Sequence, residues 1–240
     1  MRDIKSRTQK ENEKRKKYKW PVRILKILLF LFGFTLFQVA ALRFINPPVT
    51  PNIAWAWMES VIKIPPEKKP VYHWKNIEQI SPHLRRAVIA SEDQRFLSHN
   101  GFDFNEIKKA YNSLIREKKL RGASTISMQT ARSVFLLSSR HIVRKLAEIY
   151  YTVLIELFWS KHRILEMYLN TVDWGTGVTG AEAAAQKYFS KSAKNLSKDE
   201  AALMTAILPN PHKWSIKNPS SYIRMRQGQI MKAMHMMPLI

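Results

Sequence analysis

The chain of 240 residues has no cysteine, so it contains neither a disulfide nor a free thiol. This absence fits a compartment in which free thiols are a liability, although it does not fix the redox state. Acidic residues are scarce as well, because 18 Asp and Glu residues stand against 40 Lys and Arg, for a formal net charge of +22. A charge this large requires an anionic partner such as a phosphate group, an acidic lipid or a nucleic acid.

Alternating runs of apolar and polar residues, the pattern of a half-buried strand, are almost absent, and only residues 70–73 carry one. Helical spacing of apolar residues, opened by capping residues, is frequent instead. The predicted helices cover residues 82–92, 103–118, 125–137, 142–159, 163–169, 181–189, 198–208 and 220–236. We therefore expect a mostly α protein without internal repeats, in which roughly 190 residues form one compact domain.

Residues 24–42 are apolar apart from three polar side chains and would form a helix about 28 Å long, close to the thickness of a bilayer core. The basic arm of residues 1–23 precedes them, which predicts a cytoplasmic N-terminus for a transmembrane anchor. A cleaved signal peptide is the competing interpretation. It is disfavoured because the basic region is long and Ala40-Ala41 is a poor cleavage site.

Residues 43–80 are interpreted as a juxtamembrane segment between this anchor and a domain at residues 81–240. The proline-rich stretch 46–51 ends the preceding helix. Trp55 and Trp57 follow it, and two interpretations of them are equally good. Either they lie at the level of the lipid headgroups, or they are ordinary core residues.

The sequence EDQRFLSHNGFD at residues 92–103 places two carboxylates side by side. Glu92 follows an apolar run at the end of a predicted helix, where a partly desolvated carboxylate can serve as a general base. Helix capping is at least as good an explanation of Asp103, and it also applies to Asp93. Under the same interpretation, His99 forms a hydrogen bond with a buried backbone group.

Two further segments can carry chemistry. GASTISMQ, at residues 122–129, is a glycine-led loop entering a helix, an arrangement that either binds an anion or only starts the helix. Arg144, Lys145 and Glu148 share one helical face. They form either an exposed ion-pair face or a two-cation site for a diphosphate, in which Glu148 orients a cation or holds a metal ion. The glycine loop and alanine-rich helix at residues 164–189 are interpreted as buried scaffold.

Taken in order, these segments resemble the peptidoglycan glycosyltransferase family, the lipid II polymerases. EDQRFLSHNGFD is similar to ED-x-x-F-x-x-H-x-G-x-D at every fixed position, GASTISMQ to G-[GA]-S-T-I-x-Q-Q, and RKLAE to R-K-x-x-E. EAAAQKYF and EAALMTAILPNP are similar to the remaining two motifs, and the resemblance spans roughly residues 47–219. The chain departs from the family pattern at Met128, Arg132 and Thr179.

The resemblance implies a lysozyme-like α-helical fold and a monofunctional, membrane-anchored polymerase that makes β-1,4-linked glycan with inversion and releases undecaprenyl diphosphate. It assigns Glu92 as general base and Glu148 as the second catalytic glutamate, with Mg²⁺ or Mn²⁺ as a possible ion at Glu148. The residues that it assigns to substrate binding or to shaping the site are Asp93, Phe96, His99, Ser124, Thr125, Gln129, Arg132, Arg144 and Lys145.

The resemblance also implies a place in the bacterial inner membrane, with the catalytic domain in the periplasm. Its expected partners are lipid II, the growing lipid-linked glycan, the membrane and proteins of cell-wall synthesis or division. Three alternatives remain: a lytic transglycosylase or lysozyme-like hydrolase, a non-catalytic cell-wall scaffold, and a tether to anionic membrane. A nucleic-acid partner is not expected, because the predicted orientation places the basic domain outside the cytoplasm.

Overall fold

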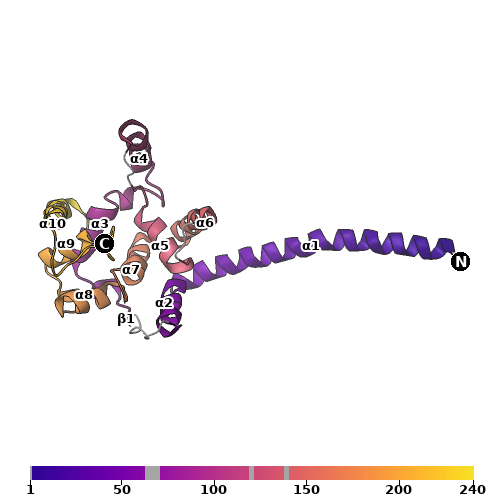
Figure 1. The fold of residues 1–240 in the computed structure, drawn as a ribbon, viewed down its shortest axis with the longest axis horizontal. Coiled ribbons are helices and arrows are strands. Elements are labelled where there is room, and N and C mark those ends of the chain that lie inside the picture. The colour runs from indigo at the N-terminus through magenta and orange to yellow at the C-terminus, as the bar shows by residue number, and fades with distance from the viewer. Residues whose placement is uncertain (1, 63–70, 119–121, 138–140) are drawn as a thin grey trace. The chain divides into compact units, whose positions relative to one another are not determined.

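The computed structural model describes residues 2–62, 71–118, 122–137 and 141–240, and these are mostly helical, as predicted (Figure 1). The chain divides into two compact units, one ending at Ile45 and the other covering Asn46–Ile240. The first unit is a single helix, α1 (Arg2–Leu42). Within the described residues, its segment Trp20–Leu42 is the one stretch of helix long and apolar enough to span a membrane.

The second unit holds the remaining helices and one short sheet. Its α-helices are α2 (Pro51–Ile62), α3 (Pro82–Glu92), α4 (Phe104–Glu117), α5 (Ile126–Phe135), α6 (Ile142–Phe158), α7 (Lys161–Thr171), α8 (Ala181–Phe189), α9 (Lys198–Ala206) and α10 (Ser221–Ala233). Short 3₁₀ helices cover Ile77–Gln79, Phe96–Ser98, Ala193–Asn195 and Met234–Met236, and the strands are β1 (Val71–Tyr72) and β2 (Val178–Thr179).

Most helix starts follow from side chains that cap the first turn. Ser81 accepts a hydrogen bond from the His83 amide, and Asp103 accepts from two amides at the start of α4. Ser197 forms a capping box with Glu200. Each of these caps satisfies amides that the helix itself leaves without a partner. The predicted starts of α3, α4 and α9 are therefore confirmed.

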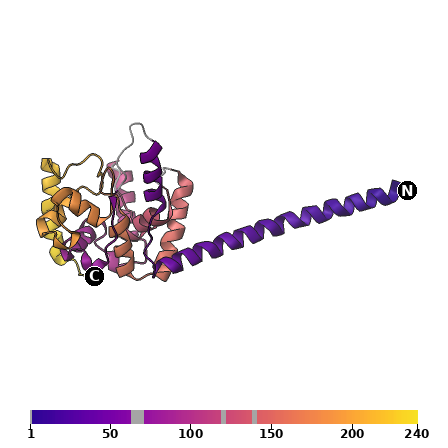
Figure 2. The same cartoon turned by 90° about the horizontal axis from the view of Figure 1, so that it is seen from below.

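Helices α5 and α7 form the centre of the unit. Helix α5 packs against both α6 and α7, while α3, α9 and α10 pack together on the other side. Figure 2 shows from below that the C-terminal helix α10, in yellow, lies at one edge of this unit. Apolar side chains such as Ile126, Leu165 and Trp174 are fully buried between these layers. Helix α5 thus packs directly against α6, which carries the predicted catalytic Glu148.

The segment before α3 belongs to the same compact unit. Strand β1 pairs in parallel with β2, with Val71 opposite Val178. The Asn170 side chain of α7 bonds the backbone of Lys75 on both sides, accepting from its amide and donating to its carbonyl at 2.8 Å each. The predicted domain boundary at residue 80 consequently lies inside the folded unit, because residues 71–80 are attached to α7.

Two helices of this unit leave apolar side chains at the surface. In α2, Ile53 is buried whereas Trp55 is half exposed, so one face packs into the core and the other does not. No residue of α4 is buried, and Phe104 and Tyr111 are among its exposed apolar residues. An exposed apolar stripe of this kind marks an interaction surface.

Candidate active site

Glu92 is the last residue of α3, as the sequence predicts, and its side chain is half-buried. Each of its carboxylate oxygens accepts one hydrogen bond. The Ser91 hydroxyl donates to Oε1 at 3.0 Å, and the Gln129 amide of α5 donates to Oε2 at 3.1 Å. The carboxylate is therefore held in one orientation by two donors from different elements.

A buried tyrosine determines which way Gln129 points. The Tyr168 hydroxyl donates to Gln129 Oε1 at 3.3 Å, so the amide nitrogen of Gln129 is directed at Glu92. Burial and the nearby Glu92 charge raise the pKa of Tyr168 well above its usual value, although the Arg132 charge opposes them. Tyr168 therefore remains a protonated donor at neutral pH.

Asp93, next to Glu92, is buried and faces protein groups. Its carboxylate bonds His99 Nε2 at 3.0 Å and accepts from the Ile126 amide, the first of α5, at 3.1 Å. A carboxylate at a helix N-terminus is stabilised by the helix dipole. Phe96 is fully buried with its ring edge-on to His99. Asp93 and Phe96 thus both contact His99, which bonds a carboxylate instead of the expected backbone group.

The glycine-led loop before α5 is largely used within the protein. Thr125 caps α5 by accepting from the Met128 amide at 3.2 Å, and its hydroxyl donates to the Gly101 carbonyl at 2.6 Å. Together with Asp93, it occupies amides that the loop was expected to offer to an anion. Ser124 is half-buried, whereas Arg121 lies outside the described residues.

Glu148, on α6, is buried, and both of its oxygens are paired with cations from the first turn of that helix. Arg144 donates to Oε2 at 2.7 Å, and Lys145 contacts Oε1. The Glu148 side chain is 1% exposed, against 19% for Arg144 and 40% for Lys145. The interpretation as an exposed ion-pair face is therefore wrong for Glu148, whose carboxylate lies beneath two partly exposed cations.

Two positive charges in the first turn of α6 are unfavourable for the helix itself, because the helix dipole is positive there. The order of charges, with the cations preceding the glutamate, is also the less stabilising one for a helix. The stability of α6 therefore does not explain why Arg144 and Lys145 stand in its first turn. Their arrangement suits an external anion, which both cations and the α6 N-terminus would attract.

The residues do not fit a divalent ion at Glu148, because an ion would have to displace both cations from its oxygens. Asp93, His99 and Asp103 also bring potential ligand atoms within 4.8 Å of one another. Those atoms are already used in the Asp93–His99 contact and in the cap of α4. We therefore assign no chemical step to a metal ion.

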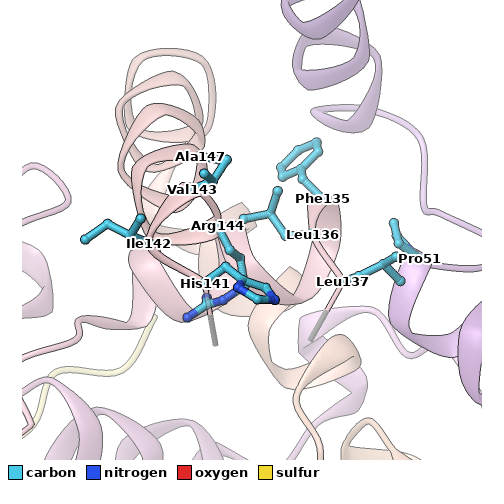
Figure 3. A pocket seen from close by; sticks show the side chains of 9 residues that line it. All are labelled: Pro51, Phe135, Leu136, Leu137, His141, Ile142, Val143, Arg144 and Ala147. Carbon is cyan, nitrogen blue, oxygen red and sulfur yellow. The ribbon is translucent and has the colours of Figure 1, made fainter. Parts of the chain in front are cut away.

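An apolar pocket of about 790 Å³ lies beside the cation pair, between the start of α2, the end of α5 and the first turns of α6. Figure 3 shows Arg144 and His141 among the apolar side chains that line this pocket. Its lining residues are Pro51, Phe135, Leu136, Leu137, His141, Ile142, Val143, Arg144 and Ala147. The pocket thus joins an apolar wall to a guanidinium group.

A buried ion pair beneath the site was not predicted from the sequence. Lys161 Nζ bonds Glu156 at 2.8 Å and the His99 carbonyl at 2.6 Å, and it lies 4.6 Å from the centre of the Phe96 ring. Glu156 also accepts from Ser127 of α5. The pair connects the loop after Glu92 with three helices. Glu156 and Lys161 are only five residues apart, but they lie on two different helices and their further partners come from distant segments, so no helical spacing signals the pair.

Comparison with known proteins identifies the family of the chain. A family model described as Transglycosylase matches residues 59–235. A biosynthetic peptidoglycan transglycosylase of Shewanella oneidensis is 46% identical over 88% of this chain and 89% of its own length. Proteins with the same description from Bacteroides thetaiotaomicron and Caulobacter vibrioides are 46% and 44% identical, over 88% of this chain and 85% and 89% of their own lengths. The chain therefore belongs to the transglycosylase family.

Proposed function

We propose that this protein polymerises lipid II into β-1,4-linked glycan strands of peptidoglycan and releases undecaprenyl diphosphate. One observation carries the proposal. Helix α5 bonds an oriented carboxylate, Glu92, on one side and packs on its other side against α6, which holds the cations Arg144 and Lys145. The proposed general base and a site for an anionic leaving group thus lie on two elements, α3 and α6, that both contact α5.

The proposed reaction is a single displacement. Glu92 accepts the proton of the acceptor 4-hydroxyl, and that oxygen attacks C1 of the donor sugar. The bond from C1 to the diphosphate oxygen breaks, its electron pair leaves with the diphosphate, and the configuration at C1 inverts. Arg144 and Lys145 then stabilise the negative charge that develops on the leaving group. Glu148 holds both cations in place from beneath.

The apolar pocket beside Arg144 supports a lipid-linked donor. In a polyprenyl diphosphate, the first isoprene units are joined directly to the charged group. A guanidinium at the border of an apolar pocket matches that junction, because the charge and the hydrocarbon are both accommodated. Proteins of cell-wall synthesis or division remain predicted partners.

The test is polymerisation of lipid II by the full-length chain in detergent or vesicles, comparing wild type with Glu92→Gln. We expect the variant to keep its thermal midpoint and to lose turnover by roughly 10²–10⁴-fold, the usual contribution of a general base. Glu117→Gln, at an exposed glutamate of α4, is the matched control and should polymerise normally.

Unchanged turnover in Glu92→Gln would show that Glu92 is structural. If the wild type made no polymer but shortened preformed glycan, a lytic transglycosylase or hydrolase would replace the proposal. A wild type that neither polymerised nor cleaved glycan would support the scaffold or the membrane tether.

A further inference from the structure

Arg226, on α10, contacts Ser91, the residue next to the proposed general base and 135 residues upstream of Arg226. Its Nη2 donates to the Ser91 hydroxyl at 3.1 Å, and its Nε donates to the Ala206 carbonyl at 3.3 Å. The residue is half-buried and, within the described parts of the chain, forms no ion pair with a carboxylate. Its charge therefore faces the Ser91–Glu92 end of α3 without a carboxylate of its own.

The direction of each hydrogen bond in this chain follows from chemistry. A guanidinium can only donate, so the Ser91 oxygen must accept from Arg226. Ser91 then has one proton left, and an ionised carboxylate can only accept, so that proton is directed at Glu92 Oε1. The order Arg226 to Ser91 to Glu92 allows no reversal while Glu92 is ionised.

We propose that Arg226 is a positioning residue for Glu92, acting through Ser91. The inference rests on the proposed function of Glu92. Arg226 fixes the Ser91 hydroxyl, which holds Oε1, while Gln129 holds Oε2. Each oxygen of Glu92 keeps a second lone pair for the acceptor hydroxyl. A hydrogen bond to a cation is stronger than one between neutral groups, and it polarises the hydroxyl that it reaches.

The relay has a specific kinetic consequence. Loss of Arg226 leaves Glu92 in place and leaves its second donor, Gln129, intact. The carboxylate then loses part of its alignment in the transition state, whereas the diphosphate contacts of the substrate are unaffected. We therefore expect kcat to fall about tenfold, less than on removal of the base itself, and KM to change less than about twofold.

A double-mutant cycle in the lipid II polymerisation assay tests the route through Ser91. It compares full-length wild type, Arg226→Met, Ser91→Ala and the double variant, with thermal midpoints recorded for each. If Arg226 acts through Ser91, each single variant loses kcat and the double variant is no slower than Ser91→Ala. Ser91→Thr, which keeps the hydroxyl, should restore most of the lost kcat.

The matched control is Arg224→Met on the same helix, because Arg224 is exposed and donates to Gln227 at 3.1 Å. It should leave kcat and KM unchanged. The proposal would be overturned by an unchanged kcat in folded Arg226→Met, by losses that multiply in the double variant, or by an effect on KM alone. A wild type without polymerase activity would instead refute the proposed function.

Discussion

At the scale of single residues, the structure depends on a few buried polar groups that each serve several partners. Lys161 is one of them, since its ammonium group meets a carboxylate, a carbonyl and an aromatic ring. Glu156 and Lys161 expose only 7% and 20% of their side chains. Removal of one member of such a pair leaves the other charge poorly solvated.

We expect Lys161→Met to lower the free energy of unfolding by about 3 kcal/mol, because Glu156 would keep only the Ser127 contact. Urea denaturation of the folded domain measures the change. Lys194→Met, at an exposed lysine, is the control and should shift the value by less than about 0.5 kcal/mol. Equal effects of the two substitutions would show that the pair adds no stability.

Residue roles were predictable from the sequence where they depended on local spacing. The position of Glu92 at a helix end, the cap at Asp103 and the shared face of Arg144 and Glu148 are all local features. The Arg226–Ser91 contact spans 135 residues and depends on how α10 packs on α3. Tertiary packing creates that contact, and no periodicity in either helix records it.

At the scale of elements, Gly180 shows how closely the start of α8 approaches α7. It stands immediately before α8 with a φ of +87°, and a Cβ atom there would lie 2.7 Å from the Asn170 carbonyl oxygen. Gly177 also has a positive φ, +70°, but a Cβ atom there would meet nothing within 4 Å. A comparison of the two positions therefore separates the cost of backbone strain, which both share, from the cost of a steric clash, which occurs only at Gly180.

We expect Gly180→Ala to destabilise the domain by about 3 kcal/mol or more, because strain and a backbone clash both act. Gly177→Ala should cost only about 1–2 kcal/mol, the price of a left-handed residue with a side chain. Thermal unfolding of both variants measures the difference. Equal losses would show that α7 moves aside without cost.

Element boundaries were predicted well where a cap or a proline marks them, as at Ser81 and Pro82. The end of α5 was placed two residues late, since the chain turns to an extended conformation at Leu136 without a glycine or proline to signal it. For α7, the predicted start at residue 163 is two residues late and the predicted end at residue 169 is two residues early. The strand at residues 178–179 was not predicted at all, because two residues are too few to show alternation.

At the scale of the whole molecule, the N-terminal segment Trp20–Leu42 is suited to span a membrane, and the family's role in peptidoglycan synthesis implies a place in the cell envelope. The basic residues before this segment predict a cytoplasmic N-terminus. With this predicted orientation, the protein would bind the acceptor and the donor on the outer side of the membrane.

A reporter fused by a flexible linker after Ile240 tests this orientation. We expect alkaline phosphatase, which needs an oxidising compartment, to be active in the fusion, and a cytoplasmic reporter such as β-galactosidase to be inactive. The same fusions with the basic residues of the arm replaced by neutral ones provide the control, since they should lose the orientation bias. A cytoplasmic C-terminus would contradict the assignment.

The attachment of residues 71–80 to α7 has a consequence for biosynthesis. Lys75 and its partner Asn170 lie 95 residues apart, and β1 pairs with a strand that is made later still. During vectorial synthesis, β1 leaves the ribosome long before either partner exists. Closing so long a loop also has an entropic cost, so the contacts of residues 71–80 with α7 and β2 must form late. The nascent domain therefore keeps its first strand unpaired until most of the chain has been synthesised, the period in which a chaperone would matter most.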